Sequence, residues 1–169
     1  MVESIDSYYR VAVHTAGHAV IAWTLGRGIS QIAIAGDSVH RGHTEIGSFE
    51  MPPPLTAPED LRRWRKDRDR MYLVAGSIAE MIAFGDHNSE ARSFDAGVSV
   101  IVDGYLDESK WSASEKAAET ALLMHWSAVV ALAEQLRHPP LKLDGRKVEL
   151  ILQEAGTEEQ LQQRRERSA

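Results

Sequence analysis

Two histidines four residues apart carry the clearest chemical signal in the sequence. His14 and His18 lie in the apolar run VAVHTAGHAVIAWTLG, residues 11–26. On a helix, side chains at this spacing share a face and start roughly 5–6 Å apart, so two imidazole rings can converge on one metal ion. The chain has no cysteine, so any metal must be bound by His, Asp or Glu. The spacing indicates a metal site, but it also fits two histidines that only pack within a helical scaffold.

Thr15 occupies the position that decides the chemistry of such a pair. In zinc peptidases with the H-E-x-x-H motif, the residue after the first histidine is a glutamate that takes a proton from the attacking water. A hydroxyl group stays protonated at neutral pH and cannot accept that proton. Loss of a general base typically lowers the rate on the order of 10² to 10⁴-fold. If the pair binds zinc, Thr15 therefore predicts impaired or absent hydrolysis.

Local signals place this histidine pair well inside the first helix. Helix N-caps are available at Ser4–Asp6, and small and apolar residues recur at helical spacing as far as Leu25. Gly26 and Gly28 then end the helix. We therefore expect His14 and His18 to project from one continuous helix.

The next segment carries strand signals. ISQIAIAG, residues 29–36, alternates with Ile32 and Ile34 on one face, DSVHRG is turn-like, and HTEIGSFEM, residues 43–51, can extend again before three prolines. Two or three strands are expected here.

The rest of the chain has helical patterns. A capping-box pattern at Thr56, Pro58 and Glu59 predicts a helix that runs to Phe84 and ends at Gly85. Three further helices are expected, over residues 94–106, over Ser112–Arg137, and over residues 143–156 with Asp144 as N-cap.

Together these elements predict a mainly α fold of the α+β kind, with a small two- to three-stranded β element near the N-terminal third. A chain of 169 residues suits one domain. We assign that domain to residues 1–156 and a polar C-terminal tail to residues 157–169.

Five stretches, in order along the chain, resemble the peptidase domain of FtsH-type AAA+ zinc metalloproteases. HTAGHAV is similar to the family's H-E-A-G-H-A-hydrophobic helix, and ISQIAIAG with GHTEIGSFEMP is similar to its strand, turn and G-Y-T edge strand. VAGSIAEMIAFG resembles its G-G-R-A-A-E-E-hydrophobic-x-F-G helix, SFDAG its S/G-N-D-L segment, and LDGRKVELIL its C-terminal L-D-G-x-x-hydrophobic-x-x-I-L. The resemblance implies this helical peptidase-like fold as a stand-alone domain without the ATPase.

The resemblance also implies a ligand set. His14 and His18 would bind Zn²⁺, Asp95 would be the third ligand, and a fourth position would remain for water. The residues alone leave other roles open, because a carboxylate at Asp95 would also suit the first turn of a helix capped by Ser93. Other nearby donors are Glu80, Asp86, His87 and Glu90.

In the family, the edge strand borders the substrate cleft. Substrate would therefore add as a strand along His43, Thr44, Glu45, Ile46 and Gly47. His43 and Glu45 could in principle replace the missing base, but a role as exposed strand residues explains them better. The chain has no G-x-x-x-x-G-K-[ST] phosphate loop, so no ATP site is expected and any ATP-driven unfolding would need a separate partner.

Charge and hydropathy restrict the partners. A formal net charge of -6 argues against a general nucleic-acid binder, and Asp67 and Asp69 interrupt the one basic stretch, RRWRKDRDR. That stretch suits a solvated face or a contact with an acidic partner. No signal peptide and no apolar run of roughly 18–20 residues is present, so we expect a soluble, cytoplasmic protein without a membrane segment. Since the family's peptidase domains form rings, the resemblance also allows a homo-oligomer.

Three hypotheses follow. The first is a zinc metallopeptidase-like protein that acts on peptides or unfolded protein and is impaired or inactive because of Thr15. The second is a non-catalytic module that binds a peptide or protein partner in the same cleft. The third is a metal-free helical scaffold in which the histidines only pack.

Overall fold

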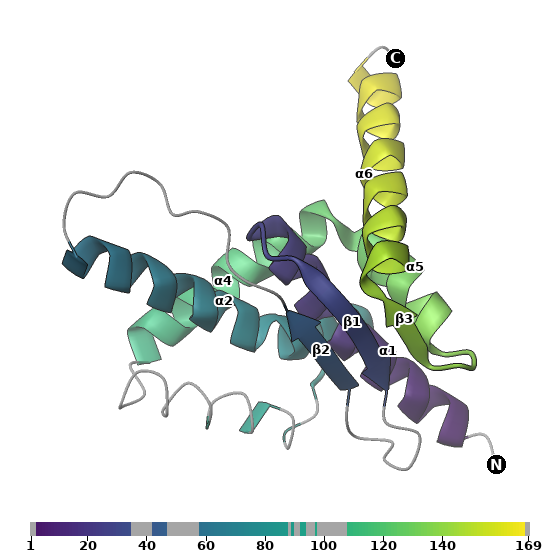
Figure 1. The fold of residues 1–169 in the computed structure, drawn as a ribbon, viewed down its shortest axis with the longest axis horizontal. Helices are drawn as coiled ribbons and strands as arrows, with labels where there is room; N and C mark the ends of the chain where they lie inside the picture. The colour runs from purple at the N-terminus through teal and green to yellow at the C-terminus, as the bar shows by residue number, and fades with distance from the viewer. Residues whose placement is uncertain are drawn as a thin grey trace.

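The computed structural model describes residues 3–34, 42–46, 58–87, 89, 92–93, 97 and 108–167. The described chain is mainly helical with one small antiparallel sheet (Figure 1), so the predicted fold class is confirmed. In chain order the elements are α1 Glu3–Thr24, β1 Ile29–Ile34, β2 Gly42–Ile46, α2 Pro58–Phe84, α4 Glu108–Met124, α5 Trp126–Leu136, β3 Lys142–Asp144 and α6 Gly145–Arg167.

Helix α1 is the central element of the molecule. It contacts α2, α4 and α5 as well as β1 and β2. Its small and apolar side chains, from Val11 to Leu25, are almost all buried, because the helix is covered on several sides. Gly26 adopts a φ of 71° just after the last turn, so the predicted glycine stop is confirmed at that residue.

Helix α2 packs against α1 along its second half. It starts at Pro58, as the capping-box pattern predicts, and ends at Phe84 before Gly85, whose φ is 77°. Its buried residues Ala75, Gly76, Ala79 and Glu80 lie against α1. A β-carbon at Gly17 of α1 would lie 2.6 Å from the Cβ of Ala79, so glycine allows the two helices to approach this closely.

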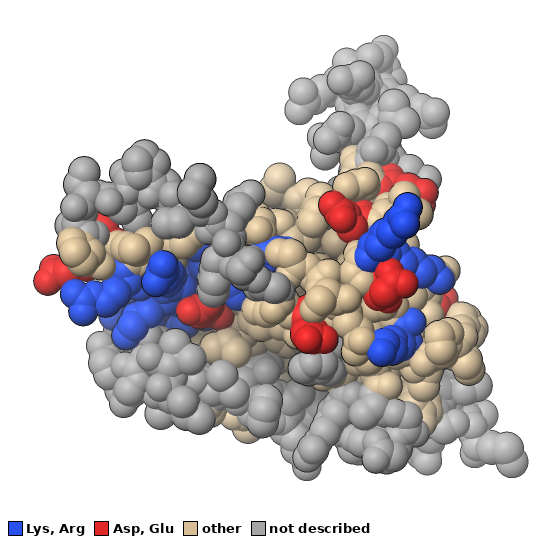
Figure 2. Space-filling view, in the orientation of Figure 1, with Lys and Arg blue, Asp and Glu red and all other residues tan. Residues whose placement is uncertain are grey.

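The basic first half of α2 is held at the end of α1. Figure 2 shows Lys and Arg side chains gathered over this part of the helix, with acidic side chains among them. Asp69 pairs with Arg27 at 2.7 Å, and Arg68 donates a hydrogen bond to the carbonyl of Leu25 while its guanidinium lies over the Trp64 ring. Arg68 and Asp69 therefore anchor α2 to the residues just after α1.

The sheet has the strand order β2-β1-β3, with both pairs antiparallel. Ile32 of β1 lies opposite Thr44 of β2 on one side and Leu143 of β3 on the other. Strand β3 was not predicted, because residues 143 and 144 were assigned to the start of a helix. Strand β2 lies at an edge of the sheet among the described residues.

Two of the predicted helices differ from those in the structure. The helix predicted over Ser112–Arg137 is two helices, α4 and α5, which meet at His125. The His125 ring packs edge-to-face on Trp23 of α1, with ring centroids 5.5 Å apart, and its backbone leaves helical geometry. Helix α6 continues to Arg167, well past residue 156. The helix predicted over residues 94–106 lies outside the described residues except for Gly97, as do residues 47–51 of the second extended segment.

None of the helices that the structure describes is long and apolar enough to cross a membrane.

Candidate metal centre

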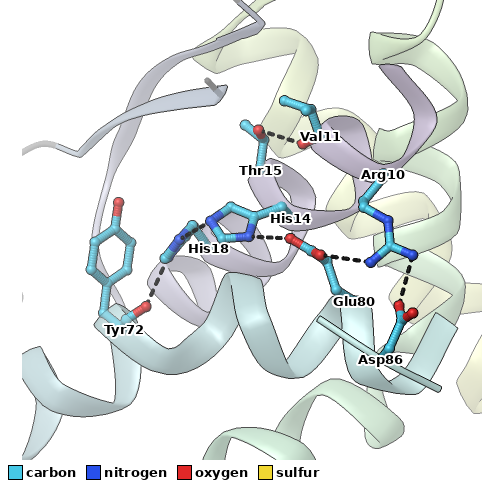
Figure 3. A network of polar contacts seen from close by, with 8 residues as sticks. All are labelled: Arg10, Val11, His14, Thr15, His18, Tyr72, Glu80 and Asp86. Atoms are coloured by element: carbon cyan, nitrogen blue, oxygen red, sulfur yellow. Dashed lines mark hydrogen bonds and ion pairs between the residues drawn. The ribbon is translucent and has the colours of Figure 1, made fainter. Parts of the chain in front are cut away.

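The structure brings His14 and His18 together on the side of α1 that faces α2 (Figure 3). Their Nε2 atoms lie 3.1 Å apart, and their ring centroids are separated by 4.8 Å. The two rings therefore converge at their outer nitrogens, as the four-residue spacing allows.

Helix α2 fixes the inner nitrogen of each ring. His14 Nδ1 lies 2.8 Å from Oε1 of Glu80, and His18 Nδ1 lies 2.8 Å from the backbone carbonyl of Tyr72. A carbonyl oxygen and an ionised carboxylate can only accept hydrogen bonds, so both Nδ1 atoms carry the proton. In the neutral form of either ring, Nε2 then holds a lone pair.

His18 is held neutral by its surroundings. Burial and the adjacent His14 ring lower the pKa of His18 to about 3, although the hydrogen bond to Tyr72 opposes this shift. A neutral His18 with its proton on Nδ1 presents an unprotonated Nε2 to His14. Two such lone pairs at 3.1 Å repel one another, and a metal ion bound to both Nε2 atoms would remove that repulsion.

The geometry fits a metal ion. An ion about 2.0–2.1 Å from both Nε2 atoms would subtend an angle of about 100° between them, which is close to tetrahedral. Metal-binding histidines commonly donate their second ring nitrogen to a carboxylate or a backbone carbonyl, and the two rings here have one of each. The side-chain and backbone partners on α2 therefore suit ligation by both rings.

Glu80 is buried between α1 and α2, with 2% of its side chain exposed. Its Oε1 accepts from His14, and its Oε2 accepts from Nη1 of Arg10 at 3.2 Å. Glu80 was an alternative metal ligand in the sequence analysis, but the described contacts make it a residue that orients His14.

The other alternative donors also have partners. Asp86 Oδ1 pairs with Nη2 of Arg10 at 2.7 Å, and Nε2 of His87 lies 3.3 Å from Nη1 of Arg92. Partial desolvation opposes the charged form of Arg10, but hydrogen bonds to Asp86 and Glu80 raise the pKa of this guanidinium, so it stays protonated.

Asp95 and Glu90 lie outside the described residues. Among the residues that are described, no group of three or more His, Asp or Glu side chains is placed to hold a metal ion. The described part of the site thus offers two imidazole ligands, and Asp95 stays a prediction as the third.

Thr15 faces the sheet. It is 1% exposed, and its hydroxyl donates a 2.8 Å hydrogen bond to the carbonyl of Val11 (Figure 3). A β-carbon built on Gly42 of β2 would lie 1.6 Å from Thr15 Oγ1, so the strand backbone lies directly against this side chain. The hydroxyl proton is committed to a backbone acceptor, and nothing at residue 15 can act as a carboxylate base.

Strand β2, the predicted substrate strand, is tied to α1 and α2. Thr44 Oγ1 donates to the carbonyl of Thr15 at 3.3 Å, and the Tyr72 hydroxyl lies 3.4 Å from the carbonyl of Thr44. Glu45 is exposed and Ile46 is half-buried. Of the other predicted substrate-binding residues, Gly47 and the side chain of His43 lie outside the described part.

The sequence analysis missed Arg10 and Tyr72. Arg10 precedes His14 by four residues, so its position on the same helix face was a usable signal. Tyr72 contacts His18 through a backbone carbonyl and through its ring, whose centroid lies 4.9 Å from the His18 ring.

A scan against models of known protein families and a search of curated proteins both found no match for this chain.

Proposed function

We propose that this chain binds one zinc ion through His14 and His18, in a peptidase-like domain whose hydrolytic activity is impaired or absent. One observation carries the proposal: the two Nε2 atoms lie 3.1 Å apart, while both Nδ1 atoms donate to acceptors on α2. The resemblance of the sequence to FtsH-type peptidase domains supports the same assignment. Asp95 is the proposed third ligand.

The donor set favours zinc over harder cations. Two neutral imidazoles with one carboxylate are typical of catalytic zinc sites, whereas Mg²⁺ and Ca²⁺ prefer oxygen ligands. When bound, zinc would supply Lewis acidity beside α1, on the side that faces α2. Cobalt substitutes for zinc in such sites and would report the ligand geometry in its visible spectrum.

The chain's own residues then perform three tasks. Glu80 and the Tyr72 carbonyl hold the two imidazoles with their Nε2 atoms directed to one point. Strand β2 offers a sheet edge to which an extended peptide or an unfolded segment can add. Residue 15 supplies no general base, because a threonine hydroxyl is not basic at neutral pH; here it donates to the carbonyl of Val11. We therefore propose that a peptide is bound far more efficiently than it is cut.

The Thr15 contact also favours a second candidate function, a module that captures peptides or a protein partner without cutting them. In that case the buried hydroxyl is a structural contact between α1 and β2, and turnover is no part of the protein's role. The two functions share the metal site and differ only in turnover.

Metal content tests the shared part. Full-length protein purified without chelator should carry close to one zinc per chain by elemental analysis. His14→Gln and His18→Gln should lose it, and Asp95→Asn should weaken binding about 10-fold or more. Wild-type protein without stoichiometric zinc, and unable to take it up, would leave only the metal-free scaffold.

Turnover separates the two functions. With zinc content matched, Thr15→Glu supplies a carboxylate at the position of the family's base and should cleave an unfolded protein at least about 10²-fold faster than wild type. Thr15→Val is the matched control, since it keeps the shape and removes the hydroxyl; it should not gain activity. Cleavage by wild type that is lost in Thr15→Val would contradict our assignment of residue 15. No cleavage by Thr15→Glu, together with peptide binding by wild type, would favour the binding module.

A further inference from the structure

We infer that Arg10 is a positioning residue of the metal centre, which raises zinc affinity by holding Glu80 in the orientation that fixes the His14 ring. The inference rests on the proposed function, because it requires His14 to be a metal ligand. It concerns a residue that lies outside the ligand set and one helical turn before it.

The argument starts from the two oxygens of Glu80. Oε1 lies 2.8 Å from His14 Nδ1, and Oε2 lies 3.2 Å from Arg10 Nη1 (Figure 3). Arg10 and His14 are both on α1, four residues apart, so one face of this helix contacts both ends of the carboxylate. A contact at each oxygen constrains the plane of the carboxylate group more tightly than a contact at one oxygen does.

Charge gives a second reason. Glu80 is 2% exposed, and a buried carboxylate is costly unless a cation and hydrogen bonds balance it. Arg10 supplies a permanent positive charge, with 30% of its side chain still exposed. Without Arg10, Oε2 of Glu80 would lose this contact, and the carboxylate would be expected to rotate toward solvent. That rotation would weaken the hydrogen bond that orients His14.

Arg10 is itself held by the end of α2. Its second terminal nitrogen, Nη2, lies 2.7 Å from Asp86, and its guanidinium carbon lies 4.6 Å from the centroid of the Phe84 ring. These contacts predict a competing, purely structural role, in which Arg10 only links α1 to α2. A test must therefore separate an effect through Glu80 from a general loss of stability.

A double-mutant cycle on the full-length chain makes this separation. Zinc affinity would be measured by competition with a chromophoric chelator for wild type, Arg10→Gln, Glu80→Gln and the double variant. Loss of a residue that orients a metal ligand costs about 10–100-fold in affinity, so we expect that range for Glu80→Gln. Arg10 acts one contact further away, and we expect about 3–10-fold for Arg10→Gln. In the Glu80→Gln background, Arg10→Gln should have almost no additional effect.

Two further variants distinguish positioning from a structural link. Arg10→Lys keeps the charge and should recover part of the affinity. Phe84→Leu removes the aromatic contact of Arg10 but leaves its bonds to Glu80; its melting temperature without metal should fall while zinc affinity stays at the wild-type value. The visible spectrum of the cobalt-loaded Arg10→Gln protein should differ from that of wild type, because the His14 ring is less constrained.

The possible results are distinguishable. If wild type takes up no zinc, the proposed function itself fails. The inference about Arg10 is wrong if wild type and Arg10→Gln bind zinc equally well. It is also wrong if Arg10→Gln lowers zinc affinity by the same factor in the wild-type and Glu80→Gln backgrounds. If Arg10→Gln does not fold, the same cycle is run with Arg10→Lys, and equal losses in both backgrounds overturn the inference in the same way.

Discussion

At the scale of single residues, the hydrogen-bond partner of Nδ1 in each imidazole decides that Nε2 is the nitrogen left for a metal ion. The helix places His14 and His18 on one face, but spacing alone does not decide which nitrogen of each ring points outward. Glu80 and the Tyr72 carbonyl decide it, because both accept hydrogen bonds from Nδ1. The metal-binding potential of this helix is therefore determined by contacts with α2.

His18 gives the metal-free protein a specific dependence on pH. The pKa of His18 is lowered to about 3 in the folded state, against 6.5 for an ordinary histidine. As the pH falls below about 6.5, the unfolded chain takes up a proton and the folded chain does not. The contribution of neutral His18 to the free energy of unfolding should therefore be complete above about pH 6.5. It should be lost as the pH falls from there toward pH 3, by up to about 1.4 kcal/mol per pH unit. Urea denaturation with chelator present, between about pH 7 and pH 4, measures it.

His18→Asn is the matched control for that measurement. Asparagine keeps an N–H donor that can reach the Tyr72 carbonyl but has no group that titrates in this range. The other titrating residues remain in both proteins, so subtracting the two pH profiles gives the contribution of His18 together with its interaction with His14. Parallel profiles for wild type and variant would mean that His18 is protonated in the folded state as readily as in the unfolded one.

At the scale of elements, the site depends on how closely α1 and α2 approach. Gly17 of α1 meets Ala79 of α2, and Gly76 of α2 meets the His14 ring. A β-carbon at Gly76 would lie 2.4 Å from Cε1 and Nε2 of that ring, a distance far inside van der Waals contact. The space that lets His14 turn toward His18 therefore exists because residue 76 has no side chain.

Gly76→Ala should consequently reverse the usual preference for alanine in helices. Alanine normally stabilises a helix interior by about 1 kcal/mol relative to glycine. Here the added methyl group forces the His14 ring to move, and we expect a net destabilisation of about 1–3 kcal/mol together with weaker zinc binding. Denaturant unfolding and zinc titration measure the two effects.

Gly156→Ala in α6 is the control for Gly76→Ala. The nearest atom to a β-carbon at Gly156 is Cη2 of Trp23 at 3.8 Å, an ordinary contact, so this change should be neutral or stabilising by up to about 1 kcal/mol. If both alanine variants gain stability equally, the close contact between Gly76 and His14 does not exist in solution.

The elements that were predictable from sequence are those with local signals. Helix α1 and its stop at Gly26, strand β1 and helix α2 all follow from periodicity, caps and glycines near their ends. Strand β3 has only three residues and is a strand because Leu143 pairs with Ile32, more than a hundred positions earlier. The break between α4 and α5 has no glycine or proline at its centre, and His125 leaves the helix where it packs on Trp23.

The candidate metal site was also predictable only where its residues carry a local signal. The pairing of His14 with His18 was predictable, because i and i+4 spacing is a property of one helix. The roles of Glu80 and Tyr72 depend on the placement of α2 against α1, which no local pattern specifies. Tyr72 acts on His18 Nδ1 through its backbone carbonyl, and any residue type has such a carbonyl.

At the scale of the whole molecule, α1 carries the two proposed metal ligands and is also the centre of the core. Among the described elements it packs against α2, α4, α5, β1 and β2, so unfolding the protein separates the two histidine rings from their partners on α2. The proposed third ligand, Asp95, belongs to the segment between α2 and α4. Zinc bound by these residues would join parts of the chain that separate on unfolding, and it should therefore stabilise the global fold.

Zinc should raise the melting temperature of the wild-type protein. A ligand that binds only the folded state contributes about 2.7 kcal/mol at a free concentration of 100 times its Kd, and for a chain of this size that corresponds to a shift of about 5–10 °C. Calorimetry with buffered free zinc, and then with excess chelator, measures the shift and its reversal. The double variant His14→Gln with His18→Gln is the control, since it should melt at one temperature in both conditions. A shift of equal size in wild type and control would place the stabilising zinc elsewhere on the protein. No shift in wild type would contradict zinc binding by His14 and His18.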